Sequence, residues 1–97
     1  MAYEIRFAVS AKRHLKAFRG RERAVILAAV ETQLSREPMV ETRNRKRLRP
    51  NPLAPWELRI GDFRVFYDVE QSGVVTVLAI GTKRGNRLRI EGVEIEL

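Results

Sequence analysis

The stretch WELRIGDFRVFYD, residues 56–68, constrains the fold more than any other part of the chain. Apolar and polar residues alternate on both sides of Gly61-Asp62, and a two-residue loop between such segments predicts a β-hairpin. Because side chains alternate between the two faces of a strand, the hairpin has one apolar face, which we expect to lie in the core. That face carries Trp56, Leu58, Ile60, Phe63, Val65, Tyr67 and Val69, whereas the opposite face carries Glu57, Arg59, Arg64, Phe66 and Asp68.

Two arginines of this hairpin face each other. Pairing outward from the loop places Arg59 directly opposite Arg64. Like charges at opposed positions destabilise a strand pair by roughly 0.2 to 1 kcal/mol. An anionic ligand bound between the two side chains would offset that repulsion, so the pair indicates a binding function.

The overall charge points to an anionic partner as well. The chain has 97 residues, and 19 Lys and Arg against 12 Asp and Glu give a formal charge of +7. Most of the basic residues are arginine, whose planar guanidinium matches phosphate oxygens better than a lysine does. We expect a polyanion or an acidic protein as partner, and a single domain that spans residues 1–97.

Composition also excludes several classes of site. The chain has no cysteine and one histidine, His14, so a disulfide framework, a thiolate zinc site and a multi-histidine metal site are ruled out. We expect neither a metal nor a cofactor. No apolar run approaches the ~20 residues of a membrane span, and charged residues interrupt the first apolar segment, so we expect a cytoplasmic protein without membrane association.

The N-terminal half predicts a strand followed by two helices. Residues 3–9 alternate as a half-buried strand, after which Ser10 is a suitable N-cap and Gly20 a suitable end for a first helix. A second helix, predicted over residues 21–37, ends before Pro38. Its apolar stripe consists of Ile26, Leu27, Val30 and Leu34.

The C-terminal half predicts a sheet. Residues 37–55 hold all four prolines and the densest basic run, RNRKRLR, which we interpret as a loop that carries charge to the sheet edge. The apolar run at 74–80 predicts a central strand, and VEIEL at 93–97 an edge strand that could pair with a partner chain. The fold class is therefore α+β, with an N-terminal strand and a two-helix hairpin packed on a three- to five-stranded antiparallel sheet.

At this point the chain resembles a known superfamily. The order of elements, the hairpin WELRIGDFRVFYDV and the following strand VVTVLAIGTKR are similar to those of the RelE/ParE toxins of type II toxin–antitoxin systems. Toxins that resemble RelE cut messenger RNA in the ribosomal A site, and those that resemble ParE inhibit DNA gyrase. The resemblance implies a cognate antitoxin, acidic in character, as partner.

The resemblance implies roles for individual residues. The arginine that orients the scissile phosphate in the RNases matches Arg64. The basic residue that follows the end of the next strand matches Lys83 or Arg84. The tyrosine that many of these RNases carry further on falls near Arg89, and the lysines that RelE carries ahead of the hairpin fall on Pro55 and Glu57.

RNA cleavage by a ribose 2′-hydroxyl needs a base, positive charge on the phosphate and an acid for the leaving oxygen. Arginine supplies charge but is a poor base, so Glu57 and Asp68 are the candidate bases, and Glu57 is favoured. A catalytic set of Glu57, Arg64 and either Lys83 or Arg84 follows. Further nucleic-acid contacts are expected from Arg43, Arg45, Lys46, Arg47, Arg49, Arg59, Arg87 and Arg89.

The remaining notable side chains favour structural roles. We expect His14 to be a structural or a surface residue. We expect Trp56 and Tyr67 to form a cross-strand pair in the core. Phe66 lies on the arginine face, where a covering segment is the favoured explanation, with an antitoxin contact or base stacking as alternatives.

Three functions remain open. The leading hypothesis is a ribosome-dependent endoribonuclease that inhibits translation, with ribosome, messenger RNA and antitoxin as partners. The alternatives are a gyrase inhibitor without enzymatic activity and an inactive relative that only binds nucleic acid or antitoxin. We expect a monomer or a toxin–antitoxin hetero-oligomer.

Overall fold

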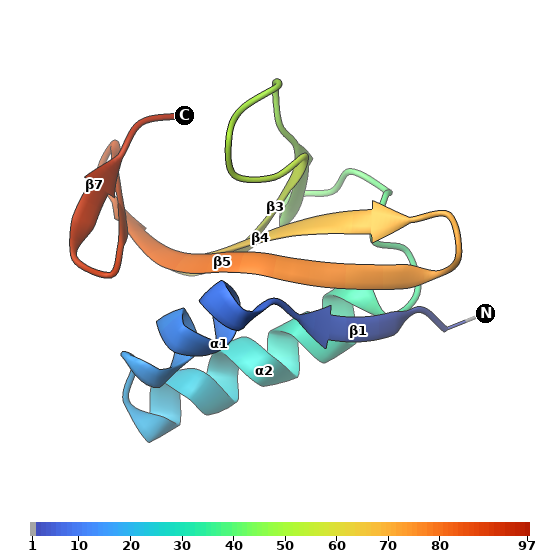
Figure 1. Cartoon of the computed structure of the whole chain (residues 1–97), viewed down its shortest axis with the longest axis horizontal. Helices are drawn as coiled ribbons and strands as arrows, with labels where there is room; N and C mark the ends of the chain where they lie inside the picture. Colours follow the sequence, from blue (N-terminus) through green and yellow to red (C-terminus); the bar gives the residue numbers. More distant parts are fainter. Residues whose placement is uncertain (1) are drawn as a thin grey trace.

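The structure is a computed structural model that describes residues 2–97. Its elements, in chain order, are β1 (Glu4–Phe7), α1 (Val9–Lys16), α2 (Gly20–Leu34), β2 (Arg45–Arg47), β3 (Trp56–Ile60), β4 (Phe63–Glu70), β5 (Val74–Arg84), β6 (Arg87–Ile90) and β7 (Val93–Ile95). Figure 1 shows both helices on one side of a curved sheet, which is the predicted α+β class. None of the helices in residues 2–97 is long and apolar enough to cross a membrane.

The β3–β4 hairpin forms in the predicted register. Gly61 and Asp62 make the loop, and Gly61 adopts a φ of +57°, a conformation that glycine reaches without steric cost. Arg59 pairs with Arg64, and Trp56 pairs with Tyr67. Alternation about a glycine-containing loop was therefore sufficient to predict this unit.

The sheet is larger than the three to five strands expected. Within residues 2–97 it has seven, in the order β2-β3-β4-β5-β6-β7, and β1 pairs with β5. The β1–β5 pair is parallel, whereas the other neighbours are antiparallel. The additional strands have local causes: part of the basic loop predicted over residues 37–55 pairs with β3 as β2, and β1 lies beside the N-terminal half of β5.

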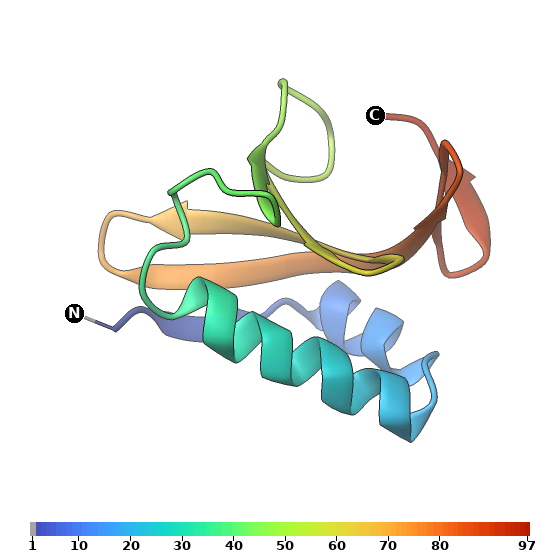
Figure 2. The ribbon, with the colours of Figure 1, turned by 180° about the vertical axis from the view of Figure 1, so that it is seen from behind.

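Each face of the sheet carries its own apolar cluster. The larger cluster lies between sheet and helices and includes Ile26, Val30, Leu34, Trp56, Leu58, Val65, Tyr67, Val75, Val77 and Ile80. The smaller cluster lies on the other face and consists of Ala54, Phe66, Ala79, Leu88 and Ile90. Figure 2 shows the helices covering only one face, while the loop before β3 and the β6–β7 end rise from the other and give it a concave shape.

Three predictions about the helices were wrong. Ala8 is the N-cap of α1, and Ser10 lies inside the helix, where its hydroxyl donates to the Leu78 carbonyl 2.8 Å away. Gly20 begins α2 and does not end α1, because the chain already leaves α1 at Lys16. Leu27 is 41% exposed, since the buried stripe of α2 is narrower than predicted and follows Ile26, Val30 and Leu34.

The concave shape depends on a close approach at Gly81. A Cβ at this position would overlap the Arg89 carbonyl oxygen and lie 2.8 Å from Cγ1 of Ile90. β5 pairs with β4 along most of its length, and from Thr82 onward it also pairs with β6. Glycine therefore permits β6 to cross β5 at the point where the sheet curves.

A polar clamp fixes the β6–β7 turn to α1. Glu91 has a φ of +54°, and it is the one non-glycine residue with positive φ among residues 2–97. Its carboxylate accepts hydrogen bonds from Arg13 at 2.9 and 3.2 Å, and it lies 3.3 Å from Nε2 of His14. Nδ1 of His14 accepts the Ile80 N–H at 3.1 Å, so Nε2 carries the proton of the neutral ring. His14 is therefore structural, as predicted.

Gly81→Ala should reduce the free energy of unfolding by about 1–3 kcal/mol, the usual cost of overpacking. Urea denaturation measures this loss as a lower midpoint. Gly20→Ala is the matched control, because its new Cβ would lie 3.7 Å from Nη2 of Arg23, an ordinary van der Waals distance. Equal stability of Gly81→Ala and wild type would contradict the close approach.

Stability should fall as the pH drops from about 7 to about 5, because burial lowers the pKa of His14 below its ordinary value near 6.5. As the pH falls, His14 therefore takes up a proton in the unfolded chain before it does so in the folded protein, and acid favours unfolding. Glu91 adds a further loss of stability at lower pH, since hydrogen bonds from Arg13 lower the pKa of its carboxyl in the folded protein. Urea midpoints across this range should vary less in His14→Gln than in wild type, and parallel profiles would contradict the neutral buried ring.

Candidate active site

Strand alternation gathers charged side chains on the concave face. Lys46 of β2 is the cross-strand partner of Glu57 of β3, which in turn pairs with the buried Phe66 of β4. The next pair on the same face of this hairpin is Arg59 with Arg64. Because residues paired across a sheet share a face, these side chains form one neighbourhood above the smaller apolar cluster.

Glu57 is the buried anion of this group. It is 4% exposed, and its Oε1 accepts a hydrogen bond from Nε of Arg59 at 2.9 Å. A buried carboxylate needs such a partner, because an unpaired charge in a water-poor site is costly. Glu57 therefore orients Arg59 and removes part of the repulsion that the sequence indicated between Arg59 and Arg64.

Arg64 has a different set of partners. Its Nη1 donates to the carbonyls of Gly61 at 2.6 Å and Phe63 at 2.9 Å, which fixes the guanidinium beside the hairpin turn. Its Nε is buried and has no hydrogen-bond partner among residues 2–97. Burial lowers the pKa of Arg64 and the nearby Glu57 carboxylate opposes this, so the group stays a cation with an unused donor.

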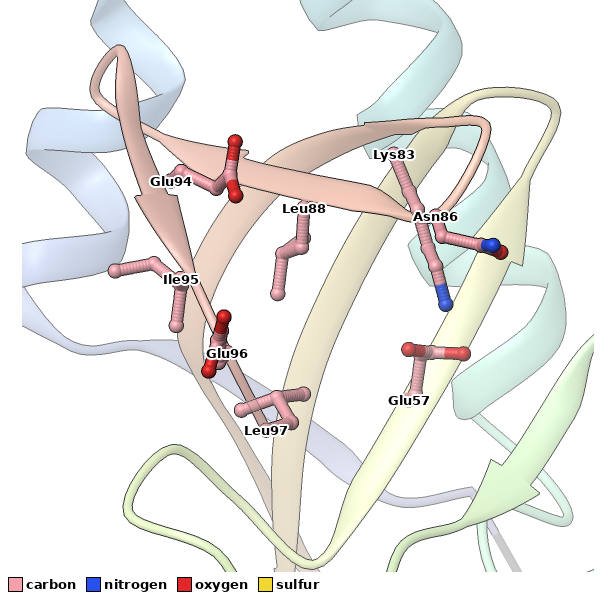
Figure 3. Close-up of a pocket in the computed structure, with 8 residues that line it drawn as sticks. All are labelled: Glu57, Lys83, Asn86, Leu88, Glu94, Ile95, Glu96 and Leu97. Carbon is pink, nitrogen blue, oxygen red and sulfur yellow. The ribbon is translucent and has the colours of Figure 1, made fainter.

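A cavity of about 340 Å³ opens beside Glu57. Its lining consists of Glu57, Lys83, Asn86, Leu88, Glu94, Ile95, Glu96 and Leu97. In Figure 3 the Lys83 amine points toward the Glu57 carboxylate, while the C-terminal residues lie across the cavity from them. The cavity lining thus combines one ammonium group, Lys83, with three carboxylates, Glu57, Glu94 and Glu96.

The structure separates the two basic residues that the sequence could not distinguish. A bulge in the β4–β5 pairing moves the register by one residue, so that Phe66 pairs with Ala79 and Tyr67 with Val77. Lys83 consequently shares the concave face with Ala79. Arg84 lies on the opposite face, in a separate cavity lined by Thr82, Arg84, Arg87 and Arg89. Of the predicted catalytic residues, Arg84 is therefore the one not brought together with Glu57.

The basic run ahead of the hairpin serves mixed purposes. Arg45 donates to the carbonyls of Gln33 and Val40, both at 2.9 Å, and so ties β2 to the end of α2. The Arg47 guanidinium lies 5.6 Å from the ring centre of Trp56, a cation–π distance. Lys46 is the member beside Glu57, while Arg43 and Arg49 are exposed outside the strand.

The aromatic side chains are packed inside the protein. Trp56 and Tyr67 stack with ring centres 6.0 Å apart, as predicted, and the Tyr67 hydroxyl donates to the Pro38 carbonyl at 2.6 Å. Burial raises the pKa of Tyr67 well above its ordinary value. Phe66 is fully buried in the smaller cluster, in agreement with the covered position expected.

Asp68 does not join the group. It is exposed, its carboxylate accepts the Val69 N–H at 2.8 Å, and it lines a different cleft beside the proline-rich loop. Glu57 is therefore the carboxylate that shares a site with Arg59, Arg64 and Lys83. Within residues 2–97 no three His, Asp or Glu side chains form a metal-binding group.

Sequence reasoning missed part of the cavity wall. Asn86, Leu88 and the residues Glu94 to Leu97 line the space beside Glu57, although they are distant from it in the sequence. The alternation in VEIEL predicted the edge strand. It gave no indication that this strand faces Glu57, because that placement depends on the crossing of β6 over Gly81.

Comparison with known proteins relates this chain to toxins of toxin–antitoxin systems. A family model described as the ParE toxin of the type II toxin–antitoxin system parDE matches residues 5–87. The crystal structure of the toxin–antitoxin complex RelBE2 from Mycobacterium tuberculosis contains a chain with 27% sequence identity and a TM-score of 0.74. The match covers 86% of this chain and 93% of that one. Among individually curated proteins, no sequence matches this chain significantly.

Proposed function

The chain belongs to the RelE/ParE family of type II toxins, and on this premise we propose that it is a ribosome-dependent endoribonuclease that cuts messenger RNA. The observation that supports the activity is the shared site of Glu57, Arg59, Arg64 and Lys83 on the concave face. Its carboxylate can serve as a base and its three cations as phosphate ligands and proton donor, which are the roles needed when a 2′-hydroxyl attacks a phosphodiester.

In the proposed reaction Glu57 is the general base. Its Oε1 is held by Arg59, so Oε2 takes the proton from the ribose 2′-hydroxyl. The 2′-oxygen then bonds to the adjacent phosphorus, and the bond from phosphorus to the 5′-oxygen breaks. Lys83 donates a proton to that leaving oxygen, which leaves a 2′,3′-cyclic phosphate and a free 5′-hydroxyl.

Arg64 and Arg59 act on the phosphate. The positive charge of the Arg64 guanidinium can stabilise a phosphate oxygen on which negative charge develops. Its position is set by the two carbonyls that its Nη1 already binds. Such a preorganised cation stabilises the transition state without reorganising during the reaction.

We also propose a cognate antitoxin as partner, on the grounds of the family and of the RelBE2 complex. The formal charge of +7 favours an acidic antitoxin. Val93 and Leu97 are 59% and 50% exposed near the concave face, and they offer apolar contacts that a protein partner would cover.

Two observations favour a second candidate. The matching family model is named for ParE, and the sequence lacks the tyrosine expected near Arg89. A gyrase inhibitor would bind its target and perform no chemistry. Cleavage of a message therefore decides between the two.

Arg64→Ala should reduce cleavage by about 10²–10³-fold, as the loss of a preorganised donor does. Glu57→Gln should reduce it by about 10²–10⁴-fold through loss of the base. Purified protein is added to a cell-free translation reaction, and primer extension measures the cuts in the message. Arg21→Ala, which removes an exposed charge on α2, is the matched control.

Control variant and wild type should cut equally. Absence of cuts with wild-type protein, together with normal translation, would overturn the RNase proposal and favour the gyrase inhibitor or the inactive relative. Full activity of Glu57→Gln would exclude Glu57 as the base.

A further inference from the structure

The β5–β6 hairpin carries a second cavity, of about 320 Å³ and lined by arginines, on the face that turns away from Glu57. Its lining residues, named here the outer arginine site, are Thr82, Arg84, Arg87 and Arg89. We propose that the outer arginine site binds phosphates of an RNA backbone, separately from the RNA at Glu57. The choice of RNA rests on the proposed function.

Strand pairing brings the four side chains together. Thr82 is the cross-strand partner of Arg89, and Arg84 is the partner of Arg87, so all four share one face. Lys83 and its partner Leu88 occupy the other face and line the Glu57 cavity. The two cavities are therefore back to back on one hairpin.

The charge of the outer arginine site is largely uncompensated. Arg84 lies 3.6 Å from Asp62, but both side chains are well exposed, at 81% and 66%, so this pair contributes little. Arg87 and Arg89 have no ion-pair partner within 4.0 Å in the part of the chain that the structure describes. An arginine opposite an arginine destabilises the hairpin unless an anion binds between them.

The geometry suits a repeating anion. Arg87 and Arg89 are two positions apart on one strand, which separates their Cα atoms by ~7 Å. A backbone with regularly spaced phosphates can contact both guanidiniums, each of which presents a fork of donors, and the Thr82 hydroxyl adds a further donor. The tight turn through Gly85, whose φ is +61°, keeps the hairpin short and the site fixed.

The lining favours nucleic acid over a protein partner. The residues of the outer arginine site are all polar or charged, and among residues 2–97 no apolar side chain lines the cavity. The centre of a protein–protein interface is depleted in charged residues, whereas nucleic-acid interfaces are polar and strongly positive. The exposed apolar residues Val93 and Leu97 do not line this cavity, because they belong to β7 and the tail that follows it.

The salt dependence of RNA binding tests the proposal. Fluorescence anisotropy measures the affinity of intact protein for a short labelled polyuridine oligonucleotide at several salt concentrations. Arg87→Ala with Arg89→Ala should weaken binding and reduce the slope of log K against log salt by about 1.4, or ~0.7 for each lost phosphate contact. Arg84→Ala with Arg87→Ala is the second variant, should the first fail to fold.

The matched control is Arg21→Ala with Arg36→Ala, which removes two exposed charges from α2 and the segment after it. This control should leave the slope unchanged. An equal change in both double variants would show a general charge effect and overturn the site, as would no change in either.

A polyglutamate peptide is the competing probe. If the Arg87 and Arg89 variant loses binding to the peptide but keeps its RNA affinity, the site serves an acidic protein and the RNA proposal is wrong. Failure of the proposed activity is recognised separately, as uncut message in the translation reaction, because the binding measurement requires no cleavage.

Discussion

The lack of space for a side chain at Gly81 is the constraint on which the concave site depends. β5 pairs with β4 and β1, and beyond Gly81 its last residues also pair with β6. At Gly81 the Arg89 carbonyl and the Ile90 side chain lie where a Cβ would be. The crossing brings β6 and β7 over the smaller apolar cluster, and Leu88 and the C-terminal residues become a wall facing Glu57.

The same arrangement explains how a protein with excess positive charge tolerates opposed arginines. Glu57 is buried under this wall and holds Arg59, while Arg64 turns its Nη1 toward two carbonyls of its own hairpin. The protein therefore relieves part of the Arg59–Arg64 repulsion internally. What remains is the positive charge of Arg64, which a bound phosphate would compensate. The two opposed arginines that the sequence predicts thus form part of a preorganised site in the folded protein.

Local patterns predicted local structure well. The loop at Gly61-Asp62, the pairing of Arg59 with Arg64 and the buried position of Phe66 all followed from alternation, because each depends on neighbours within one hairpin. The α+β class and the final strand followed from the same reasoning.

Features set by distant contacts could not be predicted. The bulge opposite Phe66 and Tyr67 reverses the alternation of β5, so Lys83 and not Arg84 faces Glu57. No residue pattern in the apolar run 74–80 reveals that shift. The first turn of α1 is similar: Ser10 has the chemistry of an N-cap, but its hydroxyl bonds to Leu78, a residue far along the chain.

The chemistry proposed for the Glu57 site is tested most directly with the substrate and not with the protein. A message that carries a single 2′-deoxyribose at the position cut by wild-type protein lacks the attacking hydroxyl. In a translation reaction the all-ribose message should be cut there to a 2′,3′-cyclic phosphate, and the deoxy-substituted message should stay intact at that bond. Equal cleavage of both messages would contradict attack by the 2′-hydroxyl and with it the role of Glu57 as base.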